Sequence, residues 1–245
     1  MGHLTAVQIE AFYEEGYVVI PHLFGTAEVH RMSRAIDDLV RNAAFLPDQR
    51  AFVYTPKKLL KRAVWVGGLD HRLRVLGRDP RLTITVAQLF DSRSLVQIIN
   101  QVHVKWPRDS TFYPLHQDSR NRRYGSVQWK DVNGRGSYVQ CLTAVTEATP
   151  SNGGLHFIPR SCKKGHLGLA FSEDAETRTD DCHIEDAVPV VLSPGDTVFF
   201  GPYTVHGSGK NYSSSRQELF INGFAYPGAN RRVYFGCGTG EEISV

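Results

Sequence analysis

Residues 114–118 read Pro-Leu-His-Gln-Asp, and with the distant His206 they organise the interpretation of the whole chain. A His-x-Asp pair followed much later by a lone His is the ligand pattern of the 2-His-1-carboxylate facial triad. That triad holds non-haem Fe(II) and leaves three coordination positions open. In a β-strand, residues i and i+2 point to the same side, so His116 and Asp118 can reach one metal while Gln117 faces away. The third ligand, His206, must then come from a strand that lies alongside.

The residues after His206 indicate a second ligand. Ser208 follows it by two residues and Arg216 by ten. The arginine guanidinium is a rigid fork of donors that matches a carboxylate in a bidentate way. A metal with open positions beside such an arginine indicates a dicarboxylate co-substrate. A lone His-x-Asp often arises by chance, and any of the 10 histidines could be a plain surface or core residue. The surroundings of His206 favour the metal site.

Length and composition fit one globular domain with no nucleic-acid or membrane partner. The 245 residues are 41% hydrophobic and 22% charged, and the net charge of +3 is too small to indicate nucleic-acid binding. No run approaches the roughly 20 apolar residues of a membrane span, and the N-terminus lacks a signal-peptide pattern. The four cysteines, at positions 141, 162, 182 and 237, have no C-x-x-C spacing. We therefore expect reduced thiols and a cytoplasmic location.

The pattern of elements predicts an all-β core with flanking helices. Residues 1–91 are expected to be mainly helical support, with a helix over 5–15, a second that begins after Thr26, and a third over 72–91. Many short strands with Gly and Pro turns over 95–235 predict a sandwich or a barrel, and their spacing fits a jelly roll with a pocket between its two sheets. The expected strands cover 17–20, 95–105, 138–145, 155–158, 188–192, 197–200, 205–209 and 219–226, with a long connection at 163–186 and a tail at 236–245. No linker is visible, so 1–245 is predicted to be a single domain.

Two polar segments each admit two interpretations. The basic residues of 57–62 could form the solvated face of an amphipathic helix, which we favour, or a wall of the active site that offers a cation to an anionic ligand. Segment 119–136 directly follows the predicted metal-ligand strand, so it could be a substrate lid or a plain solvated loop. Its Arg120 and Arg122 are candidates for substrate contact, although exposed arginines after a turn are more often simply solvated.

With these residues in view, the chain resembles the phytanoyl-CoA dioxygenase family of Fe(II)/2-oxoglutarate-dependent oxygenases. Its motifs occur in the family's order: KWP at 105–107 ahead of PLHQD at 114–118, NGGL at 152–155 running into IPRS at 158–161, PGD at 194–196, and VHGS at 205–208 followed by Asn211 and Arg216. The opening helix and the GYVVI stretch at 16–20 are similar too. The resemblance spans nearly the whole chain.

The resemblance implies a double-stranded β-helix core with iron on His116, Asp118 and His206. The 2-oxoglutarate would chelate the iron through its 2-oxo acid end, and its far carboxylate would be held by Arg216 and Ser208. The family often places a side chain near the co-substrate at the position of Gln101, which also shares a strand face with His103. The implied cofactors are Fe(II), 2-oxoglutarate and O₂, with ascorbate supporting activity.

The chain departs from the family pattern at a few positions. Leu142 stands where some members have a Trp beside 2-oxoglutarate, so we expect that contact to be absent. Arg160 and Cys162 replace the Gly and His of the family's P-G-S-H turn. That His is not an iron ligand, so the change concerns local geometry. The family's halogenases lack the metal-binding carboxylate, and Asp118 is present here, so hydroxylation or another oxidation is favoured over halogenation.

The implied function is a dioxygenase that hydroxylates, or otherwise oxidises, an unactivated C–H bond of a small molecule with release of succinate and CO₂. Family members act on acyl-CoA thioesters, amino acids and related solutes, and specialised metabolites. The compact chain leaves little room for a CoA-binding extension, so we expect a specialised metabolite or an amino-acid-like substrate. The alternatives are an acyl-CoA hydroxylase of the same family, a Zn or Mn cupin that hydrolyses or isomerises, and a non-catalytic ligand-binding jelly roll. The intact ligand set with Arg216 and Ser208 argues against the last two.

Overall fold

A computed structural model of the protein describes residues 4–46, 51–169, 183–230 and 240–245. Its α-helices are α1 Ala6–Glu15, α2 Thr26–Asn42, α3 His71–Leu76, α4 Pro80–Phe90 and α5 Asp118–Asn121. Its strands are β1 Tyr17–Ile20, β2 Phe52–Tyr54, β3 Leu60–Val64, β4 Ser94–Lys105, β5 Tyr113–His116, β6 Tyr138–Ala144, β7 Leu155–Phe157, β8 Val188–Val190, β9 Thr197–Phe200, β10 His206–Ser208, β11 Gln217–Ala225 and β12 Glu242–Ser244.

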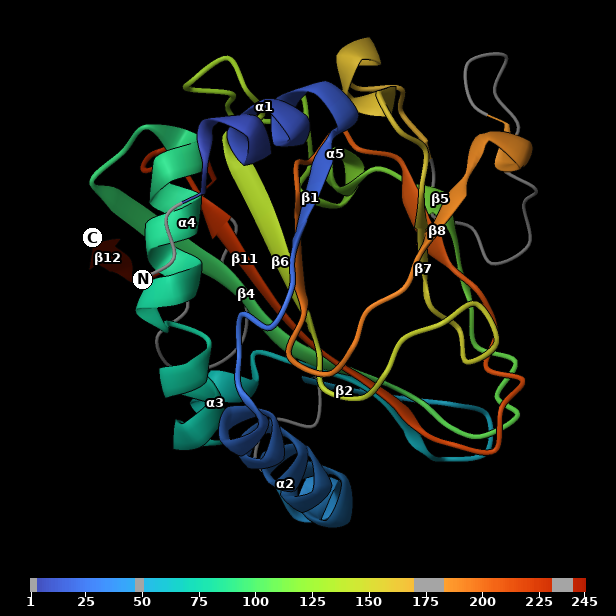
Figure 1. The fold of residues 1–245 in the computed structure, drawn as a ribbon. Helices are drawn as coiled ribbons and strands as arrows, with labels where there is room; N and C mark the ends of the chain where they lie inside the picture. Colours follow the sequence, from blue (N-terminus) through green and yellow to red (C-terminus); the bar gives the residue numbers. More distant parts are fainter. Residues whose placement is uncertain (1–3, 47–50, 170–182, 231–239) are drawn as a thin grey trace.

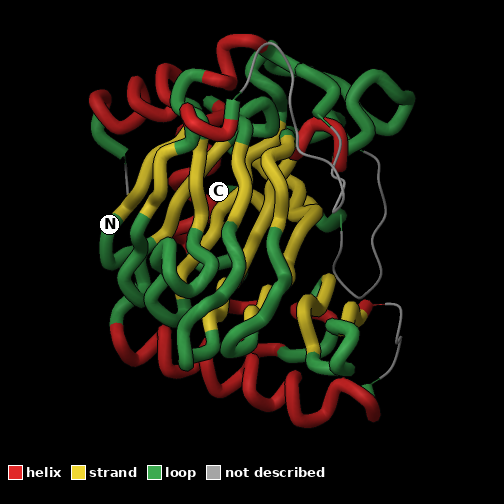
Figure 2. The backbone as a smooth tube through the Cα atoms, turned by 90° about the vertical axis from the view of Figure 1, so that its right-hand side faces the viewer, coloured by secondary structure: helices red, strands yellow, loops and turns green. Residues whose placement is uncertain are grey.

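The strands form two antiparallel sheets. The larger has the order β1-β9-β6-β11-β4-β3-β2, with β12 paired to β4, and the smaller has the order β5-β10-β7-β8. Figure 1 shows helices against the larger sheet, and Figure 2 shows the strands running side by side with helices beyond their ends. The predicted jelly-roll core with flanking helices is confirmed.

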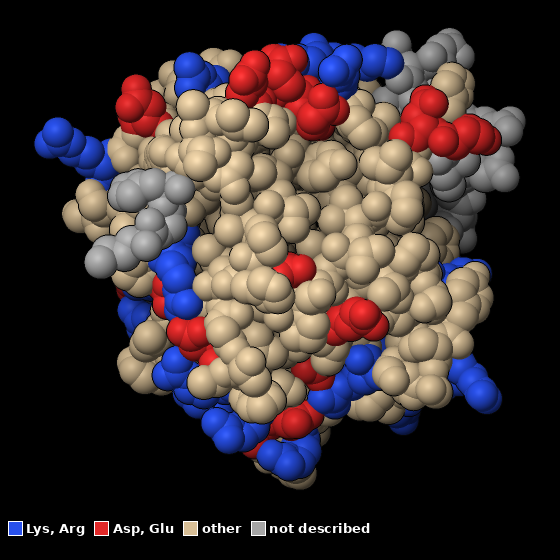
Figure 3. Space-filling model, viewed as in Figure 1, with Lys and Arg blue, Asp and Glu red and all other residues tan. Residues whose placement is uncertain are grey.

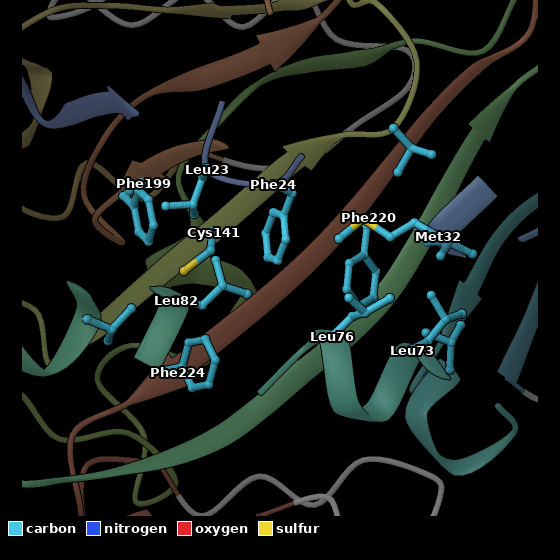
Figure 4. Packing of buried hydrophobic residues seen from close by; sticks show 14 of the residues in the cluster. Leu23, Phe24, Met32, Leu73, Leu76, Leu82, Cys141, Phe199, Phe220 and Phe224 are labelled. Carbon is cyan, nitrogen blue, oxygen red and sulfur yellow. The ribbon is translucent and has the colours of Figure 1, made fainter. Parts of the chain in front are cut away.

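Helices α2, α3 and α4 cover the outer face of the larger sheet (Figure 1). Met32, Leu73 and Leu82 from these helices pack with Phe220 and Phe224 of β11 in one buried cluster, shown in Figure 4. Each such side chain contributes roughly 1.5–3 kcal/mol by leaving water. This cluster holds the outer face of the sheet in place, so the opposite face can line a cavity.

Strand β11 belongs to both cores because its side chains alternate between the two faces. Phe220 faces the helices, whereas Leu219 and Ile221 pack with Leu155 and Phe157 of the smaller sheet. The alternation determines which side chains of this strand can point between the sheets.

The N-terminal third supplies strands as well as helices. β1 pairs with β9, and β3 and β2 extend the larger sheet beyond β4. The helix favoured for the basic segment 57–62 is therefore wrong, because residues 60–64 form β3 and Arg62 lies opposite His103. Pairing with a distant strand decides this outcome, and the local sequence does not show it.

Two further expectations change at the ends of elements. The helix predicted for 72–91 is divided into α3 and α4, because Asp79 caps a new helix that begins at Pro80. The predicted tail contains β12, whose Glu242 lies opposite Val96. The capping box of Thr5 and Gln8 on α1 is confirmed. Residues 170–182, within the connection predicted at 163–186, and residues 231–239 lie outside the described parts of the chain.

None of the described helices is long and apolar enough to cross a membrane.

A buried amide network fastens the region around α3 to the larger sheet. Asn100 Oδ1 accepts a hydrogen bond from the backbone N–H of Gly67 at 2.6 Å, and Asn100 Nδ2 donates to Asn222 Oδ1 at 2.7 Å. Gln97 Nε2 donates to the carbonyl of Gly77 at 3.0 Å. These bonds join β4 and β11 to the segment that surrounds α3.

We predict that Asn100→Ala lowers the free energy of unfolding by about 1–3 kcal/mol, because it leaves buried polar groups without partners. Chemical denaturation measures the change. Asn42→Ala, which removes an exposed amide at the end of α2, is the control and should change stability by no more than about 0.5 kcal/mol. Equal effects of the two substitutions would contradict the structural role of the network.

Candidate metal and co-substrate site

The structure brings His116, Asp118 and His206 together between the two sheets. Their ligand atoms lie within 4.8 Å of one another, and all three residues are buried. β5 and β10 pair antiparallel, with His206 opposite His116. Neighbouring strands therefore place the two imidazoles side by side, with ring centroids 4.3 Å apart.

Asp118 reaches the same side although β5 ends at His116. Gln117 keeps an extended backbone, with φ −115° and ψ 136°, so the alternation of sides continues to Asp118 at the start of α5. The Gln117 side chain points away and donates to the carbonyls of Tyr203 and Gly165 at 2.6 and 2.8 Å. His116 and Asp118 therefore point to the same side as predicted, although β5 ends at the first and α5 begins at the second.

Backbone carbonyls select the nitrogen that each imidazole offers. His116 Nδ1 lies 2.8 Å from the carbonyl oxygen of Pro114, and His206 Nδ1 lies 3.0 Å from that of Thr204. The Nδ1–H groups donate to these carbonyls, which leaves each Nε2 lone pair for a metal. Burial lowers the pKa of both imidazoles, and with the nearby His116 it lowers the pKa of His206 to about 4. Both rings are therefore neutral ligands near pH 7.

The Asp118 carboxylate fits a bound cation. Its burial raises the pKa, but the positive charge of Arg122, together with the two imidazoles at the low pH where they are protonated, outweighs burial and leaves the pKa below its ordinary value. Its Oδ2 is buried and accepts no hydrogen bond. A buried carboxylate oxygen is costly without a donor or a metal. Two imidazoles and one such carboxylate are the donor set of a non-haem Fe(II) site.

The three ligand residues line a cavity of about 490 Å³ between the sheets. This volume is in the range of small-molecule sites. Gln101, Ser208 and Arg122, among the residues predicted from the sequence, also line it. In the described part of the chain, the charged side chains of the lining are Arg62, Lys105, Arg122 and Asp118.

The lining includes a buried lysine that our site prediction did not contain. Lys105 is 2% exposed, and its Nζ donates to Ser208 Oγ at 2.7 Å and to the carbonyls of Gly209 and Gly153 at 2.6 and 2.9 Å. Burial lowers its pKa to about 7, although the Asp109 carboxylate opposes the shift. The sequence did carry a signal, because Lys105 opens the KWP motif and continues the alternating face of Gln101.

The chain at Gly153 passes close to this lysine. The φ of Gly153 is +88°, which a residue with a side chain rarely adopts, and a Cβ there would lie 2.8 Å from Lys105 Cδ. The NGGL motif therefore needs glycine at this position so that the chain can pass close to the lysine.

Positive charge surrounds the Lys105 end of the cavity. Burial and the charges of Arg62, Lys105 and Lys61 hold the pKa of His103 well below its ordinary value, so His103 is neutral. Arg62 lines the cavity, and its Nε is buried without a hydrogen-bond partner. This end of the cavity is suited to an anion. Although the predicted helix is wrong, the other interpretation of the basic segment, a wall that offers a cation, agrees with the position of Arg62.

Arg216 lies on the other face of the larger sheet. It shares the alternation of Glu218 and Phe220, whereas Gln217 shares that of Leu219, which lines the cavity. The Arg216 guanidinium contacts the carboxylates of Asp37 and Glu218 and lies over the ring of Trp106, 5.4 Å from its centroid. Arg216 thus ties α2 to β11, and the structure does not place it with Ser208 around the cavity.

The two arginines that we considered for substrate contact, Arg120 and Arg122, lie in different environments. Arg120 is exposed and donates to the carbonyl of Gly168 at 2.8 Å. Arg122 is buried in the lining, and its Cζ lies 5.2 Å from the centroid of the Tyr138 ring. Arg122 faces the cavity, and Arg120 faces outward.

Residues 12–218 match the family model described as Phytanoyl-CoA dioxygenase (PhyH). The chain belongs to the phytanoyl-CoA dioxygenase family. The chain is similar to a methylphosphonate hydroxylase of Gimesia maris, 23% identical over 89% of this chain and 80% of the relative. An ectoine dioxygenase of Streptomyces avermitilis is 24% identical over 90% of this chain and 78% of the relative.

Solved structures share the fold. EctD from S. alaskensis in its apoform superposes with a TM-score of 0.76 at 21% identity, covering 91% of this chain and 77% of that one. The carbocyclase SnoK from nogalamycin biosynthesis has a TM-score of 0.69 at 18% identity, covering 91% and 84%. Family membership and the His-Asp-His group make this phytanoyl-CoA dioxygenase family member an Fe(II)/2-oxoglutarate-dependent dioxygenase, with O₂ as co-substrate.

We predict that His206→Ala weakens Fe(II) or Co(II) binding by more than about 100-fold, because losing a ligand costs more than the 10–100-fold typical of losing a ligand's hydrogen-bond partner. Metal content after dialysis and the visible absorption of Co(II) provide the measurement. His156→Ala is the control, since His156 lies beside Gly207 on β7 and is not one of the three grouped residues. Tight metal binding by His206→Ala would remove His206 from the site.

Proposed function

We propose that this chain works as a single dioxygenase domain that hydroxylates, or otherwise oxidises, an unactivated C–H bond of a specialised metabolite or an amino-acid-like compound. The observation that carries the proposal is one cavity lined by two neutral imidazoles, a carboxylate and, farther along, a buried lysine. The relatives named for methylphosphonate and for ectoine support a small-molecule substrate. Cys141 and Cys162, free thiols in the described part of the chain, support the expected cytoplasmic location.

In this proposal His116, Asp118 and His206 hold the iron through two Nε2 atoms and a carboxylate oxygen. Bound Fe(II) supplies the oxidising chemistry, in which 2-oxoglutarate and O₂ are consumed and succinate and CO₂ are released. The surrounding side chains keep water away from the ligands, with the Phe200 ring 4.5 Å from that of His206. The hydrogen bonds to the carbonyls of Pro114 and Thr204 hold both imidazoles in one orientation.

We assign the far carboxylate of 2-oxoglutarate to Lys105 and Ser208. Among the described residues, no carboxylate lies within salt-bridge distance of Lys105, so its buried charge gains a partner when a dicarboxylate binds. Ser208 accepts from Lys105 and keeps its own proton to donate to the carboxylate. Gln101, on the same face of β4, lines the cavity and supplies a further amide contact.

The proposed reaction is tested first by succinate formation. We expect the enzyme with Fe(II), 2-oxoglutarate, O₂ and ascorbate to form succinate slowly even without its substrate, and Asp118→Ala to form none because the carboxylate ligand is lost. Succinate is quantified by mass spectrometry, with Zn(II) in place of Fe(II) as the blank. If wild type releases no succinate with Fe(II), the proposed reaction is incorrect.

We predict that Lys105→Met weakens 2-oxoglutarate binding by about 2–5 kcal/mol, the cost of removing one partner of a buried charge pair. Calorimetry under anaerobic conditions measures the affinity. Arg216→Gln is the matched control: it should lower the melting temperature, because it leaves Glu218 buried without its partner, and it should leave the affinity nearly unchanged. The reverse result would assign the carboxylate to Arg216.

The pKa of Lys105 predicts a pH dependence. Lys105 is half protonated near pH 7, and a bound carboxylate raises its pKa. Above pH 7 binding must therefore take up a proton, so affinity for 2-oxoglutarate should fall by up to about tenfold per pH unit, and below pH 7 this dependence disappears. Calorimetry in buffers of different ionisation enthalpy counts the protons, and Lys105→Met should abolish the uptake. An affinity independent of pH between about 7 and 9 would contradict the assignment.

A further inference from the structure

The cavity extends to both sides of the metal ligands. Ser208, which contacts Lys105, pairs with Tyr113 on one side of the His206–His116 pair, and Asp118 with α5 follows His116 on the other side. In the larger sheet, Lys105 and the residues around Arg122 also lie far apart. Lys105 lies opposite Gln217 and Tyr138 lies opposite Ala225, eight residues farther along β11, or about 26 Å at roughly 3.3 Å per residue.

Arg122 occupies the end far from Lys105. Its guanidinium lies over the Tyr138 ring, and the Tyr138 hydroxyl donates to Gln140 Oε1 at 2.6 Å. The Arg122 backbone N–H donates to the Asp118 carbonyl at 2.8 Å, which ties the arginine to a metal ligand. Within segment 119–136, Asn121 and Arg122 are the residues that line the cavity.

The charges of the cavity lining are unbalanced. Among the lining residues that the structure describes, three have cationic side chains, Arg62, Lys105 and Arg122, and one, Asp118, has a carboxylate. The charge of Fe(II) and that of the 2-oxoglutarate dianion cancel each other, so the lining keeps its net positive charge after both have bound. On the surface drawn in Figure 3, by contrast, many Lys and Arg residues lie at the rim beside Asp and Glu. A buried charge excess of this kind is stabilised by an anionic ligand.

We propose that Arg122 binds an anionic group of the substrate, so that the compound oxidised is a small carboxylic or phosphonic acid. The inference rests on the proposed function and adds the chemical class of the substrate. The arginine fork provides bidentate recognition of a carboxylate or phosphonate. Asn121 and Gln140 add amide groups at the same end of the cavity.

A different role for Arg122 would be to stabilise the charge of Asp118, whose pKa it lowers. In that case Arg122→Gln weakens metal binding and affects charged and neutral ligands alike. In the proposed role, metal and 2-oxoglutarate affinities are kept and only the preference for anions is lost.

The test uses the enzyme loaded with Fe(II) and 2-oxoglutarate without O₂. The probes are methylphosphonate, valerate and its neutral counterpart valeramide, each titrated by calorimetry into wild type, Arg122→Gln, Arg122→Lys and Arg120→Gln. We expect wild type to bind both anions at least about tenfold more tightly than valeramide. Arg122→Gln should reduce that ratio to about one, and Arg122→Lys should retain part of it. Arg120→Gln, which changes the exposed neighbour, should behave as wild type.

Succinate formation with O₂ is measured in the same proteins and separates the two proposals. If wild type forms succinate but does not prefer the anions, or binds none of the probes, the Arg122 inference fails and the proposed function stands. The inference also fails if Arg122→Gln keeps the preference or loses 2-oxoglutarate affinity instead. If wild type forms no succinate yet shows an anion preference that depends on Arg122, the anion site is supported and the proposed reaction fails.

Discussion

The antiparallel pairing of β5 with β10 is the interaction on which the site depends. It sets His116 opposite His206, and the extended backbone at Gln117 carries Asp118 to the same side. Both strands are short, so their geometry depends on the core between the sheets, where Phe157 and Phe200 pack against the His206 ring. Metal affinity and the packing of the smaller sheet are therefore coupled, since any shift of β10 moves a ligand.

The second constraint is the placement of one buried cation. Lys105 and Gln217 are directly opposite on β4 and β11, and Arg216 is the residue immediately before Gln217. An arginine one position later would point between the sheets, whereas Arg216 points toward α2 and binds Asp37. The positive charge near Ser208 is instead supplied from the neighbouring strand, at the same height in the fold. Shifting a cationic residue by one position along a strand moves its side chain to the other face of the sheet. The contact with the ligand is then made by a residue of the neighbouring strand, here Lys105.

The limits of sequence reasoning follow from the same geometry. The ligands, the strands around them and the capped helix α1 depend on local spacing, so they could be predicted. Arg216 was assigned from its place ten residues after His206 and from the family motif, whereas its face of the sheet follows the alternation along β11, in which it shares the side of Glu218. The basic segment at 57–62 was misread because β3 is stabilised by pairing with β4, far along the chain. Which face of the sheet the side chains of this segment occupy can be determined only when the partner strand, β4, is known.

The two ends of the cavity together constrain what can be oxidised. In the proposed arrangement, 2-oxoglutarate extends from the metal toward Lys105, so the substrate must approach from the Arg122 side. Arg122 follows Asp118 by about one helical turn, which rises about 5.4 Å, so the backbone that carries the arginine lies close to a metal ligand. In the proposed arrangement, the C–H bond that reacts lies between the metal and the anionic group held by Arg122. This geometry favours compact acids, and it disfavours long acyl chains whose reactive carbon is remote from the charge.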